Sequence, residues 1–123
     1  MIVLDSSAVI ELLIGTAMGG KVQEILDTEI AAVSPVTINE VLIGAQGKQM
    51  DVALDFFRTA QVIPFDAEAA YVSVDIERVL RKKGKVLSKQ DVFIAASCLV
   101  HQLPLLTFDK DFRNVEKLEL ISI

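Results

Sequence analysis

The sequence predicts an α/β fold in which helices cover both faces of a parallel sheet. Short apolar segments alternate along the chain with longer segments of helical periodicity, a pattern typical of β-α-β units. The chain has 123 residues, of which 52% are hydrophobic and 24% charged, so it can supply one packed core and is not expected to be disordered. We therefore expect a single domain over residues 1–123.

Apolar runs mark the strands, and helical patterns fill the intervals between them. The helix expected after Asp66 carries apolar residues at a period near 3.6, and Asp66 is a candidate N-cap. The segment Val92–Val100 is apolar on nearly every face, which predicts a helix buried on most sides, with Cys98 as a small buried residue. The predicted strands are Ile2–Leu4, Glu29–Val33, Gln61–Phe65, Leu105–Phe108 and Leu118–Ile123.

Two aspartates close predicted strands. Asp5 follows the first strand and Asp109 follows the fourth. In parallel sheets, ligands bind beyond the carboxyl ends of the strands where strand order reverses, so the two carboxylates meet there if these strands are neighbours. Each aspartate could instead serve only as the N-cap of the next helix.

Two further acids lie near predicted helix starts. Thr37 and Glu40 have the spacing of a capping box, so Glu40 could simply bond the backbone N–H of Thr37. Asp91 lies three residues after Ser88, a candidate N-cap, and acids in a first turn suit the helix dipole. Because Asp91 shares a face with the apolar residues of a buried helix, it should point inward, where a carboxylate needs a cation or a donor network.

Carboxylates that converge at one sheet edge repel one another, and a divalent cation relieves the repulsion. Mg²⁺ and Mn²⁺ prefer oxygen ligands, whereas a single His and a single Cys make a zinc site improbable. The sequence Gly19-Gly20-Lys21 lacks the phosphate-loop pattern, and no Ser or Cys nucleophile motif is evident. The sequence therefore predicts a catalytic site made of carboxylates and a bound metal ion.

Basic residues gather in one segment of an acidic chain. The net charge is −5, which argues against nonspecific nucleic-acid binding. Six of the 12 Lys and Arg residues nevertheless lie between Arg78 and Lys89 with no acid among them. They could bind a phosphate backbone, only solvate a helix end and loop, or pair with acids of a second copy. They are Arg78, Arg81, Lys82, Lys83, Lys85 and Lys89.

At these positions the sequence resembles the PIN-domain family, specifically the VapC-like toxins. The resemblance rests on Asp5-Ser6-Ser7, the segments 36–45 and 91–96, and Leu103–Phe112, in that order along the whole chain. It implies a three-layer α/β/α fold with a parallel five-stranded sheet in the order 3-2-1-4-5. It also implies an Mg²⁺- or Mn²⁺-dependent endoribonuclease, usually a dimer, held by a cognate antitoxin whose C-terminal segment blocks the active site.

The resemblance also assigns roles to individual residues. Asp5, Glu40, Asp91 and Asp109 match the family's four acids, which would hold the metal and position the attacking water. Asp111 supports or replaces Asp109, and small hydroxyls at the positions of Ser7 and Thr107 orient a metal-bound water. Apart from the resemblance, the basic segment ends just before Asp91, so we expect it to hold the RNA backbone through Arg81, Lys82, Lys83, Lys85 and Lys89.

Two alternatives remain open at this point. A phospho-receiver domain has similar length and strand-end acids, but Asp5 is followed by serine, Asp66 is a poor phospho-acceptor, and the expected lysine after the fifth strand is missing. An inactive PIN fold used only for binding is the other.

Without a secretory or membrane-spanning pattern we expect a cytoplasmic protein. A mean hydropathy of +0.48 predicts an exposed apolar patch and self-association.

Overall fold

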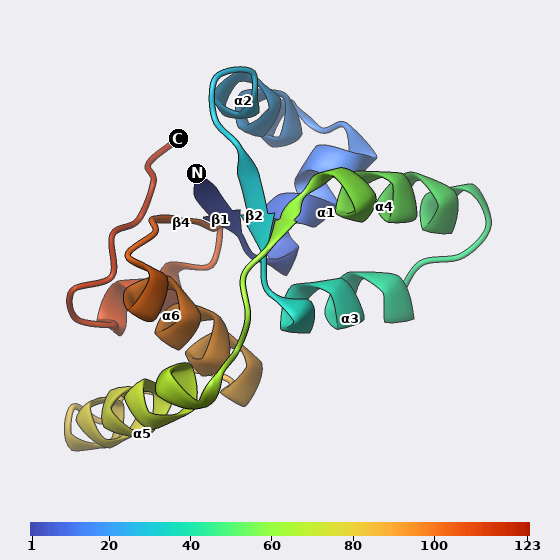
Figure 1. Cartoon of the computed structure of the whole chain (residues 1–123). Helices are drawn as coiled ribbons and strands as arrows, with labels where there is room; N and C mark the ends of the chain where they lie inside the picture. The colour runs from blue at the N-terminus through green and yellow to red at the C-terminus, as the bar shows by residue number, and fades with distance from the viewer.

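A parallel sheet runs through the middle of the molecule, with its strands in the order β3-β2-β1-β4 (Figure 1). The computed structural model describes residues 1–123. All three strand pairs are parallel, and β1 lies between β2 and β4, so the predicted fold class and the neighbouring first and fourth strands are confirmed. The strands are β1 (Ile2–Leu4), β2 (Ala31–Val33), β3 (Gln61–Val62) and β4 (Leu105–Leu106).

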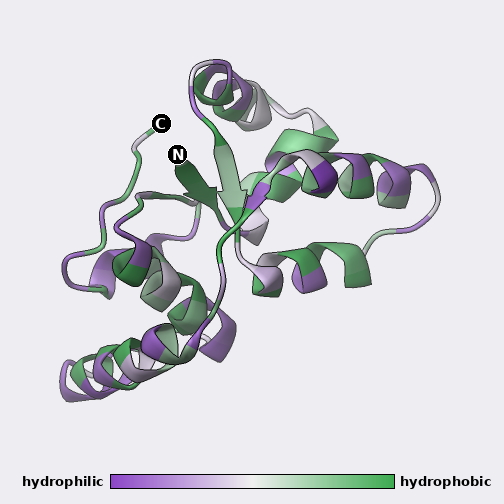
Figure 2. Ribbon diagram, in the orientation of Figure 1, coloured by the Kyte–Doolittle hydropathy of each residue, from purple (hydrophilic) through white to green (hydrophobic).

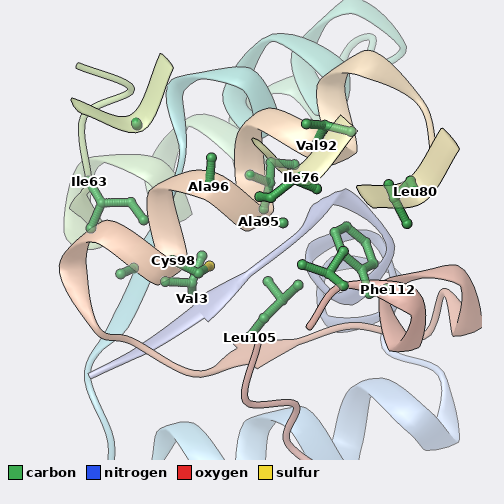
Figure 3. Close-up of a cluster of buried hydrophobic side chains, with 14 residues drawn as sticks. Val3, Ile63, Ile76, Leu80, Val92, Ala95, Ala96, Cys98, Leu105 and Phe112 are labelled. Carbon is green, nitrogen blue, oxygen red and sulfur yellow. The ribbon is translucent and has the colours of Figure 1, made fainter. Parts of the chain in front are cut away.

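Side chains alternate across the sheet and divide the core into two clusters. Val3, Ala32 and Leu105 point to one face, where they pack against α5, α6 and Phe112 (Figure 3). Their strand neighbours Ile2, Leu4, Val33 and Leu106 point to the other face and pack against α1, α2, α3 and α4. This alternation follows from the pleat of a strand and accounts for strands that are apolar throughout.

Helices cover both faces, as the alternating pattern predicts. In Figure 1, α5 and α6 lie on one side of the sheet, and α1, α2 and α4 lie on the other. Figure 2 shows purple and green alternating along the exposed helix α5, whereas α6 is predominantly apolar. The helices are α1 (Ser6–Ile14), α2 (Ala17–Leu26), α3 (Pro35–Ile43), α4 (Lys48–Thr59), α5 (Ala67–Lys82), α6 (Lys89–His101) and the 3-10 helix η1 (Lys110–Asn114).

Local signals place several helix starts correctly. Asp66 caps α5 by accepting a hydrogen bond from the backbone N–H of Ala69 at 2.9 Å. Ser88 caps α6 in the same way, through the N–H of Asp91 at 3.2 Å. The helix α6 is buried on most sides, as expected, and Cys98 is only 1% exposed.

The strands are shorter than the apolar runs suggest. The predicted strand Gln61–Phe65 ends early because Pro64 has no N–H to donate, although the N–H of Ile63 still bonds Val33 O at 2.9 Å. The prediction of a fifth strand over Leu118–Ile123 is wrong. That segment forms a single parallel bridge, Leu105↔Leu120, since the two-residue strand β4 offers it only the N–H and C=O of Leu105.

No helix combines the length and the apolar character that a membrane crossing requires.

Candidate active site at the carboxyl edge of the sheet

Asp5 is the most buried acid of the chain, with 3% of its surface exposed. It follows β1 directly and caps α1, where its Oδ1 accepts the N–H of Ala8 at 3.0 Å. Burial raises the pKa of its carboxyl, hydrogen bonds from Thr107, Ser7 and Ala8 oppose that rise, and the charge of Asp109 adds to it. Asp5 is thus a helix cap whose charged form is disfavoured by burial. The capping alternative alone does not explain why an acid is buried at this position.

Two hydroxyls tie the ends of β1 and β4 together around Asp5. Ser7 Oγ donates to Asp5 Oδ1 at 2.7 Å, and Thr107 Oγ1 donates to Asp5 Oδ2 at 2.5 Å. The same two oxygens accept backbone N–H groups, Ser7 from Phe108 and Thr107 from Asp109, each at 3.0 Å. Each hydroxyl has one proton and directs it at Asp5. Their task in this structure is therefore to fix that carboxylate.

Glu40 lies on the second turn of α3, and its predicted capping alternative is wrong. The helix begins after Ser34, whose Oγ accepts the N–H of Val36 at 3.2 Å, with Pro35 in the first turn. Glu40 is therefore too far along the helix to form a capping box with Thr37. Its Oε1 is buried and has no hydrogen-bond partner, and burial, followed by the charges of Asp91 and Asp5, raises its pKa.

Asp91 lies in the first turn of α6 and is partly exposed rather than fully directed into the core. Its pKa is raised mainly by burial, while the Ser88 hydroxyl lowers it. The charges of Asp109, Asp5 and Asp111 raise it further. Several carboxylates from different elements therefore act on Asp91 at once.

Asp109 follows β4 and caps η1, accepting the N–H of Asp111 at 2.9 Å. It is half-buried, whereas Asp111 is exposed. The charges of Asp109 and Asp111 both raise the pKa of Asp91. Asp111 therefore lies near the other acids but at their solvent-exposed side.

Together these contacts bring the four predicted acids to one edge of the sheet. The charges of Asp5 and Asp91 raise the pKa of Glu40, and the charge of Asp109 raises the pKa values of Asp5 and Asp91, although the four acids come from four different segments. No three acidic, histidine or cysteine side chains stand close enough to form a ready-made metal site. Glu40 and Asp109 also border different surface pockets.

Comparison with known proteins identifies the family. The model of the PIN domain matches residues 2–118. The chain belongs to the PIN-domain family. It is 28% identical over 102 residues to a ribonuclease VapC of Rickettsia bellii and 29% identical over 103 residues to ribonuclease VapC1 of Rickettsia felis, with 76% of both chains covered in each case.

The fold of this PIN domain recurs in solved structures. A DNA-bound VapBC from Salmonella typhimurium superimposes with a TM-score of 0.85 at 21% identity, covering 98% of both chains. The phospho-receiver alternative is thereby set aside, in agreement with the use of Asp66 as a cap for α5.

The acids of this PIN domain fit a hard divalent cation. A buried carboxylate oxygen without a donor, Glu40 Oε1, and three carboxyl groups with raised pKa values are an arrangement that a positive charge would stabilise. Mg²⁺ usually keeps several waters and takes only one or two protein carboxylates. A group of acids near one another, but too far apart for a closed cage, suits such a hydrated ion.

The basic segment is partly neutralised within the chain. Lys83 pairs with Glu116 at 2.8 Å and Lys89 pairs with Glu77 at 2.7 Å, whereas Arg81, Lys82 and Lys85 form no ion pair. Two other cations, Lys110 and Arg113, lie beside Asp109 on η1. Sequence reasoning does not single them out, because only the 3-10 turn after Asp109 places them near the acids.

Proposed function

We propose that this chain is a divalent-cation-dependent endoribonuclease and the toxin of a toxin–antitoxin pair. The observation that carries the proposal is the group of four carboxylates at the carboxyl edge of a PIN fold, Asp5, Glu40, Asp91 and Asp109, in which burial and the neighbouring acidic charges raise the pKa values of the first three. Membership of the family and the similarity to curated VapC ribonucleases support RNA as the substrate.

Each acid has a role in the proposed hydrolysis of an RNA phosphodiester. Asp5, held by Ser7 and Thr107, and Asp91 would hold Mg²⁺ or Mn²⁺ directly or through water. Glu40 and Asp109 would complete the surroundings of the ion and orient the attacking water. The bound cation would supply charge for the phosphate oxygens and make a bound water more acidic.

The test is cleavage of single-stranded RNA by the purified protein with Mg²⁺ or Mn²⁺ and with EDTA. Asp5→Asn and Asp91→Asn should abolish cleavage and weaken Mn²⁺ binding while the far-UV circular dichroism stays unchanged. Asp75→Asn, an exposed acid in the middle of α5, is the matched control and should cleave like the wild type. Full activity in EDTA, or in both site variants, would refute the proposal; RNA binding without cleavage would favour an inactive binding module.

The basic segment offers one path for RNA toward Asp91. Lys82 and Lys85 have free charges, and Lys89 is two residues from Asp91, so we propose that the loop between α5 and α6 contacts phosphates. A Lys82/Lys83/Lys85→Ala triple variant should weaken RNA binding similarly across sequences. Unchanged affinity and salt dependence would assign these residues to solubility or to pairing.

An apolar groove offers a seat for the antitoxin. The groove has a volume of about 500 Å³ and lies among α1, α3 and α4, with Glu40 in its wall. Ile14 and Val52 line the groove and are 66% and 48% exposed, so they form an exposed apolar patch of the kind expected from the mean hydropathy. We propose that the cognate antitoxin covers this groove beside Glu40. Ile14→Asp should then abolish co-purification with the antitoxin and leave RNA cleavage intact, whereas unimpaired co-purification would reject this seat.

A homodimer is the remaining partner in the proposal. Tyr71 and Val74 lie one turn apart on the outer face of α5 and are 77% and 45% exposed. Light scattering should show a dimer at tens of micromolar protein, and Tyr71→Glu should shift it toward monomer. A wild-type protein that is monomeric under these conditions would contradict the dimer.

A further inference from the structure

The molecule has a second pocket beside Asp109, with a volume of about 260 Å³. It lies between η1, the C-terminal segment and α2, and the proposed chemistry does not use it. Its lining combines apolar side chains with two cations. The residues that matter here are Met18, Phe108, Asp109, Lys110, Arg113 and Leu120.

This pocket shares a wall with the carboxylate group. Thr107 lines the pocket and donates its hydroxyl proton to Asp5. Asp109 also lines it, and the charge of Asp109 acts on both Asp5 and Asp91. A polymer bound at the acids can therefore continue directly into the pocket.

The cations of the pocket are free to meet a phosphate. Lys110 and Arg113 are three residues apart on a 3-10 helix, in which side chains at that spacing stand one above the other. Both are exposed and neither forms an ion pair, unlike Lys83 and Lys89 in the loop before α6. Two unpaired positive charges next to a group of acids favour an anion that spans both.

The apolar part of the lining points to more than an inorganic anion. Phe108, Met18 and Leu120 are each only partly buried, so they present apolar surface to the pocket. An aromatic ring next to cations is the combination that binds single-stranded nucleic acid, because every base has a face that stacks and every nucleotide carries a phosphate.

We propose that this pocket binds the RNA nucleotide next to the cleaved phosphodiester. Lys110 and Arg113 contact its phosphate, and Phe108 and Met18 contact its base or ribose. The inference rests on the proposed ribonuclease function and assigns it a substrate subsite that is separate from the loop between α5 and α6.

The experiment compares two double variants that each remove one lysine and one arginine charge. Lys110→Gln/Arg113→Gln changes the pocket, and Lys117→Gln/Arg58→Gln, the control, changes two exposed cations that line neither this pocket nor the groove beside Glu40. Binding of a fluorescein-labelled single-stranded RNA is measured by anisotropy over a salt series with Mg²⁺, in an Asp91→Asn background that prevents cleavage. Cleavage is measured separately in the wild-type background.

The pocket variant should bind RNA about tenfold more weakly, and its log affinity should depend on log salt with a slope lower by about 1.4, the single-strand value for two contacts. The control variant should change affinity less than about twofold, and Mn²⁺ binding should be unchanged in both. Equal losses in the two variants, or no loss in the pocket variant, would overturn the inference. If the wild type bound RNA but never cleaved it, the proposed ribonuclease function would be wrong. The difference in RNA affinity between the two double variants would still show whether the pocket binds RNA.

Discussion

Gly19 and Gly20 are adjacent in α2 and have opposite surroundings, which makes a paired substitution informative. A Cβ added at Gly19 would lie 2.0 Å from the backbone oxygen of Glu11 and 3.1 Å from Leu12 Cα, both in α1. A Cβ at Gly20 would meet nothing within 4 Å. The two helices therefore touch backbone to backbone at Gly19, and only a residue without a side chain permits that contact.

The magnitudes follow from this geometry. An ordinary carbon–oxygen contact is about 3.3 Å, so Gly19→Ala must push α2 outward by roughly 1 Å, and overpacking of this kind costs about 1–3 kcal/mol or more. The better helix propensity of alanine returns about 1 kcal/mol at either position. We expect Gly19→Ala to lower the free energy of unfolding by up to about 2 kcal/mol, the overpacking cost less the gain in helix propensity, and Gly20→Ala to raise it by about 0.5–1 kcal/mol.

Urea unfolding of both variants measures the difference, provided that the slope of the free energy with urea concentration stays equal to that of the wild type. Because α2 carries Met18, Gly19→Ala should also impair the pocket beside Asp109. If both variants were stabilised alike, the close approach of α1 and α2 would be refuted.

Three further predictions concern buried polar groups. Because the folded-state pKa values of Asp5, Glu40 and Asp91 are raised, the cation-free protein takes up protons on folding, so its free energy of unfolding should rise as the pH falls from neutrality toward the ordinary carboxyl pKa range of about 4. Urea midpoints in EDTA measure this, and Asp5→Asn should flatten the dependence; stability that instead fell over this range would contradict the raised values. Thr37 Oγ1 is buried without a partner, so Thr37→Val should raise the free energy of unfolding by about 1 kcal/mol, and an equal decrease would mean that the hydroxyl is bonded in solution. Burial raises the pKa of Cys98 to about 12, so iodoacetamide should modify it only after unfolding, as mass spectrometry of native and denatured samples would reveal.

The sequence by itself determined the class of fold, because strand and helix periodicities record which face of each element is buried. It also identified the caps Asp66 and Ser88, since a cap acts on a backbone N–H only three residues away. The four acids could be found for the same reason: each stands at a local boundary, at the end of a strand or near the start of a helix.

Tertiary structure alone decided how these acids are used. The Glu40 cap alternative failed because Ser34, rather than Thr37, caps α3, and the packing of α3 leaves Glu40 Oε1 buried without a hydrogen-bond partner. The hydroxyls of Ser7 and Thr107 lie 100 residues apart in the sequence and meet only because β1 pairs with β4. No local sequence pattern predicts this contact, because hydrophobic periodicity indicates which face of a helix or strand is buried but not which element packs against that face.

The same limit explains the C-terminal segment and the pocket beside it. The apolar pattern of Leu118–Ile123 is that of a strand, yet a strand exists only to the extent that its neighbour has free backbone groups, and β4 offers those of Leu105 alone. The sequence therefore determined which residues could form strands and sites. The register and length of β4 decided which of them did, because hydrogen bonds between distant segments need both partners in place.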